Sequence, residues 1–161
     1  MADQTIKGRN KILYIYGPII DAEGEPVAES YFPVACLTSN SITHTNATVE
    51  GTVTKCNQTP ETSYGGETYT ISADAENMEN DGLKASYDAI DAARELSIED
   101  NSYVYFKIVT THATGITPPT TTQFGKGIIP ELSLESPAEG AETFNFTING
   151  VGELSATDLH V

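Results

Sequence analysis

The side chains that could do acid–base chemistry are few and lie far apart in the sequence. His44, His112 and His160 all sit in polar, Thr-rich or terminal stretches. None of them is spaced from another His or from a Cys as the ligands of a metal site usually are. We therefore interpret all three as solvated surface residues.

Cys36 and Cys56 are the two thiols that could act as nucleophiles. Cys36 lies in the apolar run 32–37, where burial raises the pKa of a thiol and makes it a poor nucleophile. Two cysteines in 161 residues do not make a disulfide framework. Because cysteine is scarce and the first residues show no export signal, we expect free thiols rather than a disulfide.

Residues 74–81 hold four carboxylates and two Asn side chains, which are oxygen ligands that could hold Ca²⁺. The stretch lacks the central Gly and the ligand order of an EF-hand loop, so we interpret it as a solvated acidic connector. Gly65-Gly66 is typical of a turn, and Gly125-Lys126-Gly127 is too short for a phosphate-binding loop. We predict no catalytic residue, no metal, no cofactor and no enzymatic activity.

Short strand-like segments run through the chain, with one helix among them. Alternating or continuous apolar residues between turn residues predict about seven strands, at 11–16, 31–45, 48–55, 67–73, 102–111, 124–135 and 143–149. A stripe at helical spacing predicts a helix over 82–97, capped by Asn80 or Asp81. The stripe consists of Leu83, Ser86, Ala89, Ile90, Ala93 and Leu96. This order predicts a mainly β fold, either a β-sandwich or a partial barrel, with one flanking helix.

The chain reads as one domain, residues 1–161, without a linker or an internal repeat. We expect a flexible N-terminal arm (1–10), a loop at 21–30, a long loop between strands (46–66) and a C-terminal tail (155–161). Proline is kept out of central strands, so Pro33 and Pro130 should mark edges or bulges.

The charge balance excludes some partners. Eight basic residues face 23 acidic ones, which gives a net charge of −15. A surface this acidic repels nucleic acid and anionic lipid, so a protein that grips DNA through its phosphates is not expected. No stretch approaches the ~20 apolar residues that cross a bilayer. We expect a soluble protein made in the cytoplasm.

The last third of the chain resembles a known family. Residues 124–137 are followed by a turn, by Thr143-Phe144-Asn145-Phe146-Thr147-Ile148, and by Asn149-Gly150-Val151-Gly152-Glu153-Leu154. This is similar to the C-terminal hairpin of the major tail (tail tube) proteins of long-tailed, siphophage-type bacteriophages. The opening 8–15, the run 34–42 and the single helix before Tyr103 are similar as well.

The resemblance implies a structural virion protein of the phage tail. Its subunits would form hexameric rings that stack into a tube, through which DNA passes into the host without specific binding. The protein would not insert into a membrane. Further partners would be the tape-measure protein and the tail terminator and distal tail proteins.

A channel for DNA needs a wall that does not bind it. We predict Glu50, Glu131 and Glu135 as lumen-facing acids, because the last two lie on the polar face of a two-faced strand. The alternative is that these are solubility charges on the outer surface. Candidate contacts between rings are Lys7, Arg9, Lys11, Asn57 and Tyr64.

The sequence is also compatible with a second function class. An extracellular immunoglobulin-like adhesion or carbohydrate-binding module would share the short strands and the Thr- and Asn-rich faces. The absence of Trp for sugar stacking and the helix in mid-chain disfavour such a module.

Overall fold

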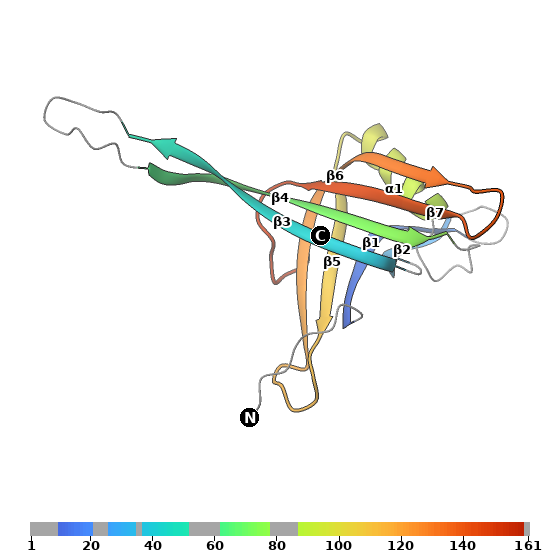
Figure 1. The fold of residues 1–161 in the computed structure, drawn as a ribbon, viewed down its shortest axis with the longest axis horizontal. Coiled ribbons are helices and arrows are strands. Elements are labelled where there is room, and N and C mark those ends of the chain that lie inside the picture. Colours follow the sequence, from blue (N-terminus) through green and yellow to red (C-terminus); the bar gives the residue numbers. More distant parts are fainter. Residues whose placement is uncertain (1–9, 21–25, 35–36, 52–61, 78–86, 160–161) are drawn as a thin grey trace, which may run out of the picture.

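The computed structural model describes residues 10–20, 26–34, 37–51, 62–77 and 87–159. They form seven strands and one helix (Figure 1). The strands are β1 (Lys11–Ile20), β2 (Pro26–Pro33), β3 (Leu37–Glu50), β4 (Thr62–Glu76), β5 (Val104–Thr111), β6 (Thr120–Glu135) and β7 (Thr143–Gly150), and the helix is α1 (Tyr87–Glu99). The predicted mainly β fold, with a helix between the fourth and fifth strands, is confirmed.

All seven strands belong to one antiparallel sheet, in the order β2-β1-β5-β6-β7-β4-β3. The sheet curls strongly. This curvature brings Leu13 of β1 and Ile42 of β3, which are far apart in the strand order, to the same small cavity of about 120 Å³. It does not close into a barrel. In the part of the chain that the structure describes, β2 and β3 remain the two open edges.

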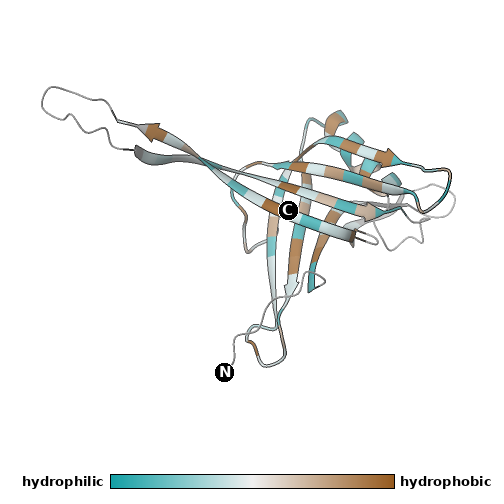
Figure 2. Cartoon of the chain, viewed as in Figure 1, coloured by the Kyte–Doolittle hydropathy of each residue, from teal (hydrophilic) through white to brown (hydrophobic). Residues whose placement is uncertain are grey.

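The core lies on the concave side of this sheet. Alternation along β7 places Phe144, Phe146 and Ile148 inward, each at most 2% exposed, and leaves Asn145 and Asn149 outside. Figure 2 shows the same alternation of apolar and polar residues along the strands of the body. Burial of a large apolar side chain contributes roughly 1.5–3 kcal/mol, so the alternation fixes which face of each strand is buried.

Two strand boundaries were predicted wrongly. The loop expected at 21–30 overlaps β2, which begins at Pro26, and the strand expected over 31–45 is broken between Pro33 and Leu37. Proline has no N–H to donate to a ladder, and Pro33 does end an edge strand, as predicted. The other predicted break, Pro130, lies at a bulge where the pairing of β6 with β7 shifts between Ile128 and Glu131.

The long loop predicted at 46–66 is also wrong at both of its ends. Thr48, Val49 and Glu50 pair with Tyr64, Ser63 and Thr62 as continuations of β3 and β4. The separate strand predicted at 48–55 is therefore the outer end of β3. Figure 1 shows these ends as a two-stranded hairpin that projects from the body, and we call residues 45–50 and 62–68 the arm. Residues 52–61 lie outside the described residues.

The arm contains one bulge. The pairing of β3 with β4 shifts between Asn46 and Thr48, where two residues of β4, Gly65 and Gly66, lie opposite the single residue Ala47. A Cβ at Gly65 would lie 3.0 Å from the Cβ of Ala47 and 3.1 Å from its carbonyl oxygen. Glycine at this position lets the two backbones approach at the bulge.

The helix packs through small residues. Ala89, Ile90, Ala93 and Ser97 are its buried side chains, whereas Leu96, predicted in the apolar stripe, is 41% exposed. A Cβ at Gly17 of β1 would lie 3.0 Å from the Cβ of Ala93, so this contact leaves no room for a larger side chain at either position. The rest of the predicted helix, 82–86, and its predicted cap lie outside the described residues.

The C-terminal segment is not a free tail, contrary to the prediction for its described part. The backbone N–H and C=O of Ser155 bond to Phe124 of β6 at 2.8 and 2.7 Å. The hydroxyl of Tyr31 in β2 donates to Asp158 at 2.6 Å. β7 ends before it reaches Phe124, so the backbone groups of Phe124 pair with Ser155 instead of with β7. These bonds attach the C-terminal segment to the sheet.

Candidate functional site

A polar surface covers the outer side of the last half of β6, β7, the inner part of β4 and β3. Strand register sets its residues side by side in rows: Glu131–Thr147–Ser72–Ser41, Ser133–Asn145–Asp74–Ser39 and Glu135–Thr143–Glu76. We call this surface the acidic face. Its carboxylates are Asp74, Glu76, Glu131 and Glu135, and all four are exposed.

The strand segments that form the acidic face contain no Lys or Arg of their own to offset its charge. These segments are residues 37–46, 67–76, 128–135 and 143–150. The one histidine among them, His44, lies on the other side of β3, where its ring is 6.1 Å from that of the inward-facing Tyr69. A phosphate that approaches this face therefore meets unneutralised carboxylates among hydroxyl and amide groups.

The structure brings together only two of the three predicted lumen-facing acids. Glu131 and Glu135 lie on the acidic face, but Glu50 is the last residue of β3 in the arm. Asp74 and Glu76 were missed because residues 74–81 were read as a connector. Their signal was the alternation of β4, which continues past Ser72 with Ala73 and Ala75 buried between the polar positions.

The predicted contacts between rings are scattered. Tyr64 lies in the arm and is 85% exposed, and its neighbour Val49 is 55% exposed. Lys11 is instead half-buried at the start of β1, where it lines the small cavity beside Leu13. Lys7, Arg9 and Asn57 lie outside the described residues, as do Cys36, Cys56 and His160.

A second surface covers the outer side of β1, β5 and the first half of β6. We call it the Tyr–Lys face. Its residues are Tyr14, Tyr16, Tyr105, Lys107, Phe124 and Lys126, with Tyr31 of β2 and Tyr103 at its borders. Lys107 Nζ lies 4.8 Å from the ring centroid of Tyr14 and 5.1 Å from that of Tyr31.

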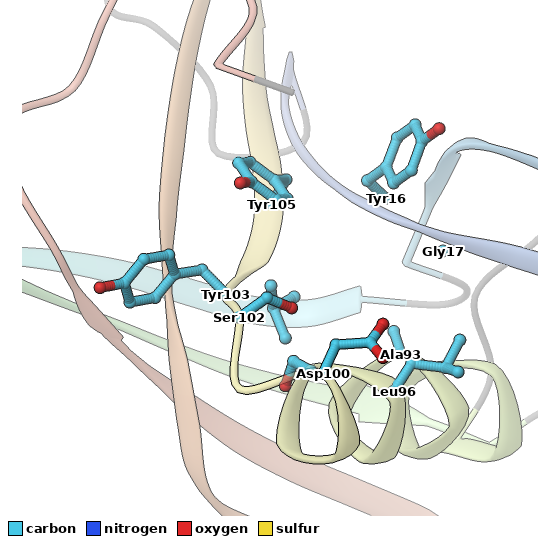
Figure 3. A pocket seen from close by; sticks show the side chains of 10 residues that line it. Tyr16, Gly17, Ala93, Leu96, Asp100, Ser102, Tyr103 and Tyr105 are labelled. Carbon is cyan, nitrogen blue, oxygen red and sulfur yellow. The ribbon is translucent and has the colours of Figure 1, made fainter. Parts of the chain in front are cut away.

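A pocket of about 190 Å³ opens where the Tyr–Lys face meets the end of α1. Tyr16, Tyr103 and Tyr105 line it from β1 and the start of β5, and Leu96 and Asp100 line it from the helix side (Figure 3). Of the residues that the structure describes, neither a histidine nor a cysteine lines this pocket. Its lining is suited to bind an apolar side chain or one that contacts tyrosine, and it contains no group arranged for catalysis among the described residues.

Glu142 links three elements beside the acidic face. Hydrogen bonds from the Ser136 hydroxyl and the Asn77 amide lower the pKa of its carboxyl. Asn77 also accepts the N–H of Tyr87, the first described residue of α1, at 3.1 Å. This relay fixes the β6–β7 turn and the helix start to the end of β4.

The described residues offer no catalytic constellation. His44 pairs with Glu67 in the arm, and His112 contacts the hydroxyl of Thr121 at 2.7 Å on the exposed ends of β5 and β6. Within the described ranges, no three His, Cys, Asp or Glu residues are placed to hold a metal ion. In those same ranges, no helix is both long and apolar enough to cross a membrane.

Comparison of the chain with known proteins gives matches at the level of structure. No family model and no curated protein matches the sequence. The tail of an empty gene transfer agent particle, refined with C6 symmetry, matches with a TM-score of 0.62 at 16% identity, over 95% of this chain and 99% of that one. The SPP1 tail tube matches with a TM-score of 0.54 at 16% identity, over 93% of this chain and 78% of that one. A chain of the six-fold symmetrised anti-feeding prophage baseplate matches with a TM-score of 0.59 at 8% identity, over 100% of both.

The chain has the tail-tube fold. The fold implied by the sequence resemblance is thereby confirmed, and the geometry explains the motif that carried it. A Cβ at Gly150 would lie 2.2 Å from ring atoms of the buried Tyr69, so the tail-tube fold here requires glycine. Gly152 has a φ of +77°, and Leu154 then packs against the core.

Proposed function

We propose that this chain is a structural tail tube protein of a phage-type particle, and that it self-assembles into stacked hexameric rings. The observation that carries the proposal is the tail-tube fold over nearly the whole chain, including a match to a tail refined with C6 symmetry. In this proposal the protein resides in the virion tail, its main partner is itself, and it has no enzymatic activity. Tape-measure, terminator and distal tail proteins would contact the ends of the tube.

The open sheet supports self-assembly. Edge strands present unpaired backbone N–H and C=O groups, which template pairing with another chain. Here both edges, β2 and β3, are open among the described residues, and β3 is 14 residues long. Copies that complete one another's edges would convert this hazard into the contact that closes a ring.

The acidic face is the proposed wall of the lumen. Its four carboxylates per copy give 4 × 6 = 24 in a ring of six. Each ring would repel the phosphates of a passing duplex within a Debye length of ~8–10 Å. The hydroxyl and amide groups between the carboxylates keep the wall wetted, so DNA would slide without adhering.

The arm is the proposed contact with the next ring. It projects from the body (Figure 1), and it carries two apolar side chains, Val49 and Tyr64, that its own chain leaves exposed. Tyrosine combines a large contact area with a hydroxyl and is favoured at interfaces. Removal of residues 57–66 is therefore expected to leave a folded monomer that stacks poorly.

Charge reversal on the acidic face tests this assignment. Tubes of Glu131→Lys/Glu135→Lys should retain duplex DNA at low salt and release it as salt rises, whereas wild-type tubes should not retain it. The matched control is Glu139→Lys/Glu153→Lys, which makes the same charge change at exposed positions outside the four strands of this face. Equal retention by both variants would assign the acidic face to the outer surface. Failure of the wild type to form rings would contradict the proposal itself.

A further inference from the structure

The Tyr–Lys face is a basic surface in a strongly acidic chain. The strand segments that carry it, residues 11–20, 104–111 and 120–128, contain no Asp or Glu. Lys107 and Lys126 project from these strands, and Lys126 Nζ lies 5.0 Å from the ring centroid of Tyr103. Two acidic groups of the same chain border this face: Asp158 is hydrogen bonded by Tyr31, and Asp100 lines the pocket beside Tyr103.

Within the described segments, these lysines have cation–π contacts but no ion-pair partner. Among the described residues, the ion pairs are His44–Glu67 and Arg94–Asp91. A tyrosine ring attracts an ammonium group but does not neutralise it. The rings therefore hold both amines in place while their positive charge stays available to a carboxylate from outside the chain.

The C-terminal half of α1 presents the complementary chemistry. Glu95 and Glu99 are exposed there, as is Asp100 directly after the helix, and the last turn of the helix contains no base. The helix dipole places partial negative charge at this end, so acids here are unfavourable in the isolated chain. Ile98, 63% exposed, adds an apolar side chain to the same stretch.

We propose that the Tyr–Lys face of one copy binds the acidic C-terminal half of α1 of a second copy. Each surface carries what the other lacks: positive charge beside aromatic rings on one, and negative charge beside an exposed apolar side chain on the other. The pocket lined by Tyr16, Tyr103 and Tyr105 offers a recess for the apolar side chain (Figure 3). The inference rests on the proposed self-assembly and names one of its contacts.

The contact joins two unlike surfaces, which determines the kind of assembly. A contact between different patches propagates from copy to copy and closes into a ring when the rotation permits. A contact between identical patches would stop at a dimer. The pairing of a sheet face with a helix is therefore compatible with a ring of subunits.

A charge swap tests the proposal. Lys107→Glu/Lys126→Glu changes the sheet side, and Glu95→Lys/Glu99→Lys changes the helix side. Each double variant alone should raise the protein concentration needed for assembly at least tenfold at low salt, measured by sedimentation velocity and electron microscopy. An equimolar mixture of the two should assemble near the wild-type concentration, because alternating copies restore every contact. The quadruple variant, whose net charge equals that of the wild type, should do the same.

Folding and alternative partners are controlled within the same experiment. If Lys107→Glu unfolds the chain by removing its ring contacts, the pair Lys126→Glu and Glu99→Lys gives the same test with smaller shifts. Normal assembly of each double variant alone, or no rescue on mixing, would overturn this contact and leave the tube proposal standing. Loss of duplex DNA binding with unchanged assembly would also overturn it, since the lysines would then serve nucleic acid. Wild-type protein that stays monomeric at all concentrations would overturn both proposals.

Discussion

Replacement of Gly150 by alanine tests how the end of β7 is packed against the core. A Cβ there would lie 2.2 Å from two ring carbons of Tyr69, whereas non-bonded carbons prefer about 3.5–4.0 Å. The ring would have to move by more than about 1 Å. It is 2% exposed, packs 6.1 Å from the ring of Phe106, and donates its hydroxyl to the Lys126 carbonyl at 3.1 Å.

The expected cost follows from these contacts. Overpacking a filled core costs about 1–3 kcal/mol, and a weakened part-buried hydrogen bond adds about 0.5–1.5 kcal/mol. We therefore expect Gly150→Ala to lower the free energy of unfolding by roughly 2–4 kcal/mol. Urea unfolding of the monomer, followed by circular dichroism, measures this difference at constant m-value.

Two further variants make the test specific. Gly66→Ala is the matched control in β4, since a Cβ there meets nothing within 4 Å, and we expect a change within about 0.5 kcal/mol. Tyr69→Leu removes the ring that Gly150→Ala would strike, so the second substitution should cost less in that background. A Gly150→Ala variant as stable as Gly66→Ala, or equally destabilising with and without the Tyr69 ring, would refute this account of the motif.

Three other perturbations have definite expected outcomes. Gly65→Val should clash with Ala47 at the bulge and disturb the arm, so that ring stacking fails in electron micrographs while the thermal unfolding of the body is unchanged. The lowered pKa of Glu142 contributes stability that is present above its unfolded value of 4.5 and is lost as pH falls through the lower folded value. Glu142→Gln should therefore be less stable than wild type at pH 7 and equal to it in strong acid by denaturant titration; an equal difference at both pH values would contradict this. Asp158→Ala should remove the hydrogen bond from Tyr31 and speed proteolysis of the C-terminal segment, and an unchanged rate would show that this hydrogen bond does not hold the segment in place.

Much of the body of the fold was predictable from the sequence because one face of each central strand is buried. Phe144, Phe146 and Ile148 alternate with polar residues, and burial on one side only produces that pattern. The helix was also identified, but its packing was not. The close contact with Gly17 requires a small side chain at Ala93. Leu96, which the apolar stripe predicts to be buried, instead lines the pocket at the surface.

The arm could not be recognised in the sequence for a physical reason. Two strands that leave the body have no core to face. Residues 62–66 therefore show no apolar alternation, and the weak alternation over 48–55 predicts a separate strand instead of an extension of β3. The first part of β2, residues 26–30, was predicted as a loop, because an edge strand tolerates Pro26 and a mixed composition. Hydrogen bonds across the sheet hold these segments as strands.

The acidic face was only partly predictable. Glu131 and Glu135 were found from the two-faced pattern of one strand, but rows of side chains across β6, β7, β4 and β3 depend on register. Pro130 predicts an irregularity in β6, but the sequence does not give the size of the register shift that the bulge introduces. The alternation of β4 places Asp74 on the outer side of its strand, but its position beside Asn145 follows only from the register of β4 with β7.

A cryo-electron microscopy map of the concentrated wild-type protein tests the central claim most directly. The account predicts stacked six-fold rings around an open channel, with Glu131 and Glu135 of every copy on the channel wall. Monodisperse monomers, or rings that carry these two carboxylates on their outer surface, would contradict it.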